Sequence, residues 1–354
     1  MSRITTFAFA ISLVALSSHA QEETTPLPAD QQTNGTRTLD ALSLVQNTTR
    51  PSIVQIIDEN GETAQLGVVV TSDGYVITKA SEVPGLDLVF AWSDGTQCAA
   101  SVVLMDRGLD LLLAKADRSD TIPIAWSPST KSERGEWMLS FNKPAASAMT
   151  IRLGNISASR RSIIGHGAAL GIRMDNSRTS GVRIVEVATE SPAEAAGIKT
   201  EDVLIALDDQ PVTDTSSLSR VMMTLQPGEQ VKLRIRRGPT EHDCSVRLAS
   251  KSKVVANWDG EDYANGGVSL RTDNFPDVLQ HQLPLNPHDM GGPLLNLDGQ
   301  AIGINIARVD RVSTFALPME TFWNKVQQWI VADRKAMDGG VPEIRPAESP
   351  ERVK

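Results

Sequence analysis

Short runs rich in Val and Ile, separated by Asn-Gly or Asp-Gly, constrain the fold of this chain more than any other feature. The stretch PSIVQIIDENGETAQLGVVVTSDGYVITKASEV is interrupted at Asn60-Gly61 and Asp73-Gly74, and LDLVFAWSDGTQCAASVVLMD repeats the pattern with Asp94-Gly95 at its turn. These dipeptides favour tight hairpins because their residues adopt positive φ at little cost. Short strands at this spacing predict a closed or nearly closed antiparallel barrel.

The N-terminus predicts export. The chain of 354 residues, long enough for two or three domains, begins with MSRITTFAFAISLVALSSHA. One arginine, an apolar run from Ile4 to Leu16 and small residues up to Ala20 are typical of a secretory signal peptide over residues 1–20. The apolar run is too short for a membrane-spanning helix of about 20 residues. We therefore expect a periplasmic or secreted protein with no membrane span after cleavage.

Charge and cysteine content exclude several kinds of partner. With a formal net charge of −9 and a pI near 5.2, neither nucleic acid nor an anionic membrane is an expected partner. Cys98 and Cys244 fall in different predicted domains, and two unpaired, small apolar thiols are a better interpretation than a disulfide, although a disulfide is conceivable after export. No His/Cys cluster has metal-ligand spacing, so we expect no metal and no cofactor.

Residues 163–250 follow a different pattern. A strand at ALGIRM precedes the helical turn SPAEAAG, which ends at Gly197, and then the strand and turn of DVLIALDDQPV. An amphipathic helix from about Ser216 to Leu225 and a basic strand, KLRIRRG, complete the segment. This combination resembles a bacterial PDZ domain over nearly the whole segment, and the motifs are specific.

The remaining β segments, before and after the PDZ-like segment, resemble one protease domain. The run HDMGGPLLNLDGQAIGIN is similar to the segment around the nucleophilic serine in trypsin-like proteases of the HtrA/Deg family. GEWMLSFNKP and IRLGNISASRR resemble the strands that precede that segment in the family. The resemblance implies a mainly β fold: a two-barrel, trypsin-like (chymotrypsin-type) structure with an inserted α+β PDZ domain. A domain is tolerated at an exposed loop because its own termini lie close together.

The expected domain organisation follows from these matches and from the polar, Pro-rich termini. A short amphipathic helix is expected over Leu39–Val45 and a closing helix over Met319–Val331. In chain order we expect a signal peptide (1–20), a disordered leader (21–36), the first part of the trypsin-like domain (37–162), the inserted PDZ domain (163–250), the second part of the trypsin-like domain (251–333) and a disordered tail (334–354).

Only the acid of the catalytic triad matches the family. Asp110 occupies the position of the family's aspartate in a D-x-x-x-D-L-A-L pattern, whereas Ser81 stands where the family's G-x-x-I-T-N-x-H motif has histidine. Met290 stands where the nucleophilic serine should be, and His288 replaces the glycine two residues earlier. A serine hydroxyl is no useful base at neutral pH, and a thioether cannot form an acyl intermediate. The oxyanion hole is also in doubt because histidine adopts glycine-like backbone angles only with strain.

Other histidines do not supply an obvious substitute. His166 and His242 lie in or beside the PDZ-like segment, while His281 and His288 precede Met290. In subtilisin, losing either the serine or the histidine of the triad lowers the rate by about a millionfold. We therefore expect no peptidase activity.

The PDZ-like groove is the predicted working surface. In PDZ domains, backbone N–H groups of a Φ-L-G-Φ loop bind a C-terminal carboxylate, and the peptide adds as a strand beside the following strand and the long helix. The resemblance assigns these roles to Ala169, Leu170, Gly171, Ile172 and Arg173, with Leu218, Val221 and Met222 lining the side-chain pocket. The helical residues could equally be the buried face of an amphipathic helix.

The sequence therefore predicts an exported pseudoprotease of the HtrA/Deg type that binds proteins or peptide C-termini. A regulator of active relatives, a chaperone-like holder of unfolded proteins and an adaptor all fit, and so do homo-oligomers or hetero-oligomers with active relatives. The main alternative is an active serine endopeptidase of protein quality control with displaced catalytic residues. In a third reading the barrels are a structural support and binding is confined to the leader and tail.

Overall fold

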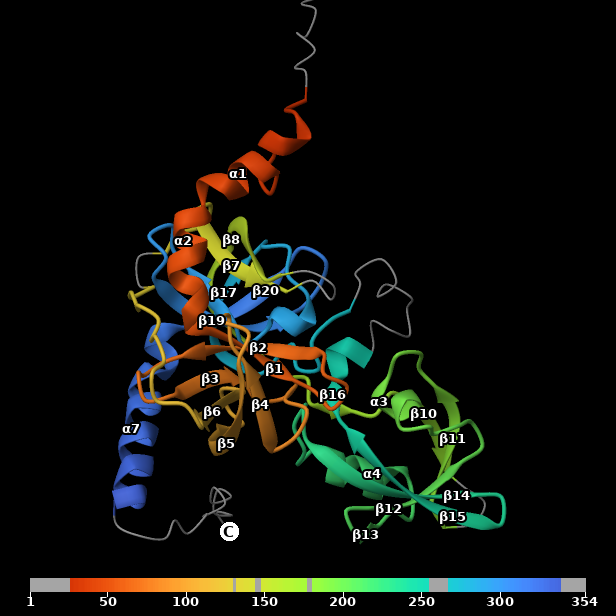
Figure 1. Cartoon of the computed structure of the whole chain (residues 1–354). Coiled ribbons are helices and arrows are strands. Elements are labelled where there is room, and N and C mark those ends of the chain that lie inside the picture. Colours follow the sequence, from red (N-terminus) through yellow and green to blue (C-terminus); the bar gives the residue numbers. More distant parts are fainter. Residues whose placement is uncertain (1–25, 130–131, 144–147, 177–179, 255–266, 339–354) are drawn as a thin grey trace, which may run out of the picture.

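The computed structural model describes residues 26–129, 132–143, 148–176, 180–254 and 267–338. It is mainly β, with two closed six-stranded barrels and a smaller sheet beside them (Figure 1). The expected signal peptide and residues 339–354 of the expected tail lie outside the described residues.

The first barrel is formed by consecutive hairpins, as the Asn-Gly and Asp-Gly dipeptides predict. Gly61, Gly74 and Gly95 all have positive φ at the turns. The strands close in the order β1-β2-β3-β6-β5-β4, and β4 pairs with β1. Their bounds are β1 Ile53–Ile57, β2 Thr63–Val69, β3 Tyr75–Lys79, β4 Asp87–Ala91, β5 Gln97–Asp106 and β6 Leu111–Ala116.

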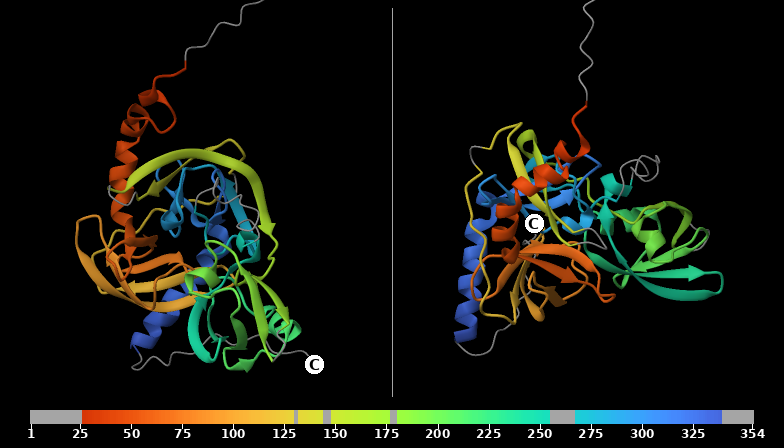
Figure 2. Two further views of the ribbon diagram at one scale, coloured as in Figure 1. Left: turned by 90° about the vertical axis from the view of Figure 1, so that its right-hand side faces the viewer. Right: turned by 45° about the horizontal axis from the view of Figure 1, so that its top comes forward.

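The second barrel combines strands from both sides of the smaller sheet. Its order is β17-β20-β19-β18-β7-β8, and the long β8 arcs from this barrel toward the smaller sheet (Figure 2). The barrel closes because β8 pairs with both β7 and β17, strands separated by more than 130 residues. The bounds are β7 Trp137–Asn142, β8 Thr150–Ile163, β17 Phe275–His281, β18 Pro293–Leu295, β19 Ala301–Arg308 and β20 Thr314–Pro318, with the 3-10 helix η3 at Pro287–Asp289.

The smaller sheet lies between β8 and β17 in the chain and runs in the order β10-β11-β12-β14-β15, with β13 added to β12. It has its own core, which includes Leu170, Leu204 and Leu218. A two-residue pair, β9 with β16, joins the two ends of this unit. The bounds are β9 Ala168–Ala169, β10 Ile172–Asn176, β11 Val182–Val187, β12 Val203–Leu207, β13 Gln210–Pro211, β14 Gln230–Arg237, β15 Thr240–Arg247 and β16 Ala249–Ser250.

Two short helices of this unit begin at capping residues. Helix α3 (Pro192–Ala195) begins where the Ser191 side chain accepts a hydrogen bond from the N–H of Glu194. Helix α4 (Thr215–Met222) begins with a capping box between Asp214 and Ser217 and is slightly shorter than the helix expected from Ser216 to Leu225.

The C-terminal helix α7 (Met319–Asp338) runs along both barrels (Figure 1). Its Asp333 accepts a hydrogen bond of 2.7 Å from the Tyr75 hydroxyl, and Lys325 lies 3.0 Å from Asp106. The expected helix ended at Val331, and the expected tail began at residue 334. That expectation was wrong for the residues up to Asp338, which continue the helix. Contacts of the last turns with the first barrel hold them in this conformation.

The N-terminal segment also departs from the expected disordered leader. Residues Ala29–Gln31 form the 3-10 helix η1, and Asn34 exchanges two side-chain hydrogen bonds of 2.9 Å with the backbone of Leu153 in β8. These contacts with β8 order residues 26–36, although the composition alone is typical of disorder. The expected helix near Leu39–Val45 is two helices, α1 (Thr36–Ala41) and α2 (Ser43–Thr49), followed by the 3-10 helix η2 (Arg50–Ser52).

A buried polar chain lies inside the second barrel. His281 Nε2 is 2.9 Å from Asn305 Oδ1, and Asn305 Nδ2 donates to Ser140 Oγ over 2.7 Å. His281 is fully buried, and desolvation lowers the pKa of its imidazole to about 4. The folded protein therefore contains the neutral ring at neutral pH.

We predict a loss of stability at acid pH that depends on His281. The unfolded chain, in which the imidazole pKa is near 6.5, binds more protons than the folded chain between pH 6.5 and 4. The free energy of unfolding should therefore fall by roughly 3 kcal/mol as the pH drops through this window. Urea unfolding at several pH values should show a smaller decrease for His281→Gln, whereas the exposed control His242→Gln should behave as the parent. Equal pH dependence in the parent and in His281→Gln would contradict the assignment.

Candidate functional site

Asp110, the residue at the position of the catalytic acid, is buried and paired with a lysine. Its carboxylate lies 3.1 Å from Lys79 Nζ, at the end of β3. Lys79 is itself fully buried and also donates to the carbonyl of Ile306 over 2.7 Å. A buried charge is tolerated only when paired and hydrogen-bonded. Here an ammonium group, rather than an imidazole, compensates the carboxylate.

Ser81, at the position of the catalytic histidine, supplies the other partners of Asp110. The Ser81 N–H donates to Oδ1 over 2.7 Å, and its hydroxyl donates to Oδ2 over 2.9 Å. The hydroxyl proton therefore points to the carboxylate. The structure brings Ser81 and Asp110 together, but the pair contains no group with the basicity of an imidazole.

Met290, at the position of the nucleophile, is completely buried. Its side chain belongs to the core of the second barrel, where its neighbours include Met138, Leu283 and Leu294. The Met290 carbonyl accepts a hydrogen bond of 3.0 Å from the N–H of Leu66 in β2. The side chain therefore serves as core packing and does not join Ser81 and Asp110.

The following glycine holds this loop against the first barrel. Gly291 has φ of 83°, and a Cβ placed on it would lie 2.1 Å from the Leu66 carbonyl oxygen and 2.3 Å from Thr78 Oγ1. Only glycine accommodates both the positive φ and this close approach. The Gly-Gly-Pro-Leu run of the family is thus used in packing one barrel on the other.

The backbone before Met290 is closed on itself. Residues Pro287–Asp289 form η3, and the Met290 N–H donates to the Pro287 carbonyl over 3.1 Å. In serine hydrolysis the N–H of the nucleophilic residue helps to stabilise the oxyanion. At Met290 this N–H is already bonded to the Pro287 carbonyl. His288 lies within η3 and does not have positive φ, so its backbone does not copy the glycine that the family has there.

Asp289, directly before Met290, anchors the loop from the inside. Its buried carboxylate accepts three hydrogen bonds of 2.7 Å, from Asn142 Nδ2 and from the N–H groups of Lys143 and Asn286. Burial nevertheless raises the pKa of this carboxyl above its usual value. Asp289 is not among the residues predicted for the site.

The four histidines of the described chain are engaged elsewhere. His281 contacts Asn305, and His288 Nδ1 lies 3.2 Å from the Ala64 carbonyl. His166 Nδ1 is 3.1 Å from Asp273, and His242 lies 3.0 Å from Thr240. None of these imidazoles contacts Asp110 in the described residues.

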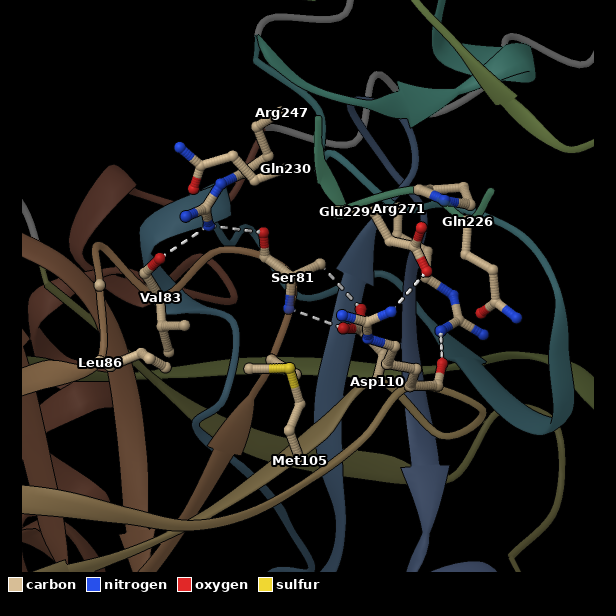
Figure 3. Close-up of a pocket in the computed structure, with 15 residues that line it drawn as sticks. Ser81, Val83, Leu86, Met105, Asp110, Gln226, Glu229, Gln230, Arg247 and Arg271 are labelled. Carbon is tan, nitrogen blue, oxygen red and sulfur yellow. Dashed lines mark hydrogen bonds and ion pairs between the residues drawn. The ribbon is translucent and has the colours of Figure 1, made fainter. Parts of the chain in front are cut away.

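A cavity of about 250 Å³ adjoins Ser81 and Asp110 (Figure 3). Val83, Leu86 and Met105 contribute its apolar wall from the first barrel, and the turn of residues 226–229 closes it from the smaller sheet. The Ser81–Asp110 pair is therefore at a boundary between two parts of the chain. No group of three or more His, Cys, Asp or Glu side chains is arranged to hold a metal in the described residues.

The predicted carboxylate-binding loop is held by backbone contacts with β16 and α3. Ala169 pairs with Ala249 in the β9–β16 pair, and Leu170 is buried with its carbonyl accepting from the Ala193 N–H over 2.9 Å. Gly171 has φ of 84°. These contacts hold the loop at the start of β10.

The predicted groove lies beside an edge strand. Strand β10 begins at Ile172 and pairs only with β11 within the described residues, so its other edge faces helix α4. Arg173 is exposed and lies 3.0 Å from Glu186. On α4, Leu218 belongs to the core, whereas Val221 and Met222 are half-buried. The alternative reading of a buried helix face therefore holds for Leu218.

Comparison with known proteins agrees with this architecture. A family model of the PDZ domain matches residues 168–248. A probable periplasmic serine endoprotease, DegP-like, from Marinomonas sp. is 22% identical over 283 residues, covering 56% of this chain and 60% of the relative. The DegP-like protein of Rickettsia conorii is 19% identical and covers 66% of this chain and 63% of the relative.

The chain belongs to the HtrA/Deg family. It spans less than two thirds of the length of these curated relatives. The relatives are named periplasmic proteins, and this HtrA/Deg protein is likewise exported and periplasmic. The solved structure of the HtrA-type protease AlgW with a decapeptide is 14% identical and covers 59% of this chain and 98% of that chain, with a TM-score of 0.31.

Among the helices of the described residues, none has the length and apolar character needed to cross a membrane. Cys98 and Cys244 are free, and the Cys98 sulfur accepts a hydrogen bond of 3.3 Å from the Trp92 indole N–H.

The Lys79–Asp110 pair yields a stability prediction. Replacing Lys79 by methionine leaves a buried carboxylate without its cation, so the free energy of unfolding should fall by about 3–5 kcal/mol. Adding Asp110→Asn should recover part of this loss because the unpaired charge is removed. Arg183→Met, which breaks an exposed contact with Glu201, is the control and should cost less than about 1 kcal/mol. Urea unfolding measures all three, and equal losses for Lys79→Met and Arg183→Met would refute the role of the pair.

Proposed function

We propose that this HtrA/Deg protein is a pseudoprotease that binds proteins or peptide C-termini through its PDZ domain and does not hydrolyse them. The observation that carries the proposal is the burial of Met290 in the core of the second barrel at the nucleophile position. The curated relatives are named serine endoproteases, so the proposal separates this chain from the activity in their names.

The chemistry of the three positions supports the absence of hydrolysis. Acyl transfer needs a nucleophile, a base that takes its proton and donors for the oxyanion. A thioether occupies the first position, a hydroxyl bonded to Asp110 the second, and the Met290 N–H is engaged by Pro287. Because all three positions differ from those of an active site, we expect that a change at one of them would not restore the reaction.

The PDZ unit supports the binding function. Strand β10 is an edge strand, and an extended peptide can add to such an edge through backbone hydrogen bonds. The positive φ of Gly171 shapes the loop at the start of this edge. We assign the peptide-binding role to the predicted loop, Ala169, Leu170, Gly171, Ile172 and Arg173, and to Val221 and Met222 on α4, with Leu218 supporting them from the core.

The first test concerns hydrolysis. The purified protein should release no peptides from casein and should not be labelled by a fluorophosphonate probe, because no hydroxyl in the site is activated. An active trypsin-like protease treated in parallel is the positive control. Covalent labelling that disappears in Ser81→Ala would refute the proposal and favour an active enzyme with displaced catalytic residues.

The second test concerns peptide binding. Peptides with an apolar C-terminal residue and a free carboxylate should bind with a Kd typical of weak peptide recognition, on the order of micromolar, and amidated peptides should bind at least about tenfold more weakly. Met222→Lys, which places a charge in the groove, should weaken binding by a similar factor. Met223→Lys is a matched control because the adjacent Met223 is 78% exposed. Fluorescence anisotropy measures these affinities, and equal affinities for free and amidated peptides would contradict carboxylate recognition.

A further inference from the structure

The turn between α4 and β14 lies directly on Ser81 (Figure 3). A Cβ placed on Gly228 would be 2.4 Å from Ser81 Cβ and 3.0 Å from Ser81 Cα. Gly228 has φ of 86°, and its N–H donates to the Leu248 carbonyl over 2.7 Å, so the backbone of the turn is fixed within the PDZ domain. Ser81, which stands at the position of the family's catalytic histidine, is therefore in contact with the PDZ domain.

Polar contacts reinforce this approach. Arg247, at the end of β15, donates from Nη1 to the carbonyls of Ser81 over 3.1 Å and Val83 over 2.7 Å. Burial lowers the pKa of this guanidinium, which indicates that the contact is largely shielded from water. At the other end of the turn, Arg107 lies 2.8 Å from Glu229.

The same segment of the first barrel contacts the connection that returns from the PDZ domain to β17. Glu82 Oε1 accepts a hydrogen bond of 2.6 Å from the Leu270 N–H and lies 3.7 Å from Lys79 Nζ. Leu270 in turn accepts from the N–H of Ser250 in β16 over 2.8 Å. Residues 81–83 thus contact the PDZ domain and its return connection at once.

We propose that Ser81, at the former histidine position, is a docking residue that holds the PDZ domain in one orientation on the first barrel. The contact uses the backbone and Cβ of Ser81, whereas its hydroxyl remains on Asp110. Docking engages the α4–β14 turn and the end of β15, the sheet edge opposite to β10. The β10 edge is therefore left open to a peptide while the domain is docked.

The test compares two glycines of the PDZ domain that share positive φ but differ in surroundings. Gly228→Ala should undock the domain, because its methyl group would overlap Ser81. Gly238→Ala is the matched control, since Gly238 has φ of 59° and nothing lies within 4 Å of its Cβ position. Hydrogen exchange in residues 81–83 and at Leu270 should be about tenfold faster or more in Gly228→Ala and unchanged in Gly238→Ala.

Arg247→Gln and its control Arg236→Gln keep the test decisive if Gly228→Ala does not fold. Arg247→Gln removes both bonds to the carbonyls of Ser81 and Val83 and should accelerate exchange in the same segment. Arg236→Gln, which removes a bond to Ser180 inside the PDZ domain, should not. Adding Ser81→Gly to Gly228→Ala should slow exchange again, because it removes the methylene that the alanine would overlap.

Unchanged exchange at residues 81–83 in Arg247→Gln, or in a folded Gly228→Ala, would overturn the docking role. Peptide affinity is measured separately on the same variants. A lost docking contact with retained peptide affinity separates this inference from the proposed binding function, and neither result depends on the absence of hydrolysis.

Discussion

The pairing of Lys79 with Asp110 is the constraint on which the centre of the molecule depends. A carboxylate enclosed between barrels is costly unless a cation and donors surround it, and Lys79 and Ser81 fulfil both needs. Through Ile306 the lysine also ties β3 of the first barrel to β19 of the second. An acid that serves chemistry in active relatives is here part of the joint between the barrels.

The inserted domain is accommodated by a second group of buried polar contacts. Arg271, on the return connection, is almost fully buried and donates to the carbonyls of Arg107 and Gly108, two residues of the loop that leads to Asp110. It also donates to the carbonyls of Asp273 and Asn274, where β17 begins. One side chain therefore joins the connection that leaves the PDZ domain to the loop that carries the acid.

The sequence predicted the architecture because its signals are local. Hairpin dipeptides located the first barrel, and the motifs around Asp110 and Met290 aligned both halves of the protease fold. Lys79 was visible as the residue in place of the motif's asparagine, but its burial against Asp110 depends on strands brought together only by folding. The contacts of Arg247 and Gly228 join segments more than 140 residues apart, and no local pattern encodes them. The order of residues 26–36 likewise comes from contacts with β8, which composition does not reveal.

The burial of Met290 restricts which side chains position 290 can accept. A thioether that fills the interior of a barrel is supported by its neighbours, and a return to serine there would leave both an empty volume and a hydroxyl surrounded by hydrocarbon. Folding stability therefore opposes a serine at position 290 in this core.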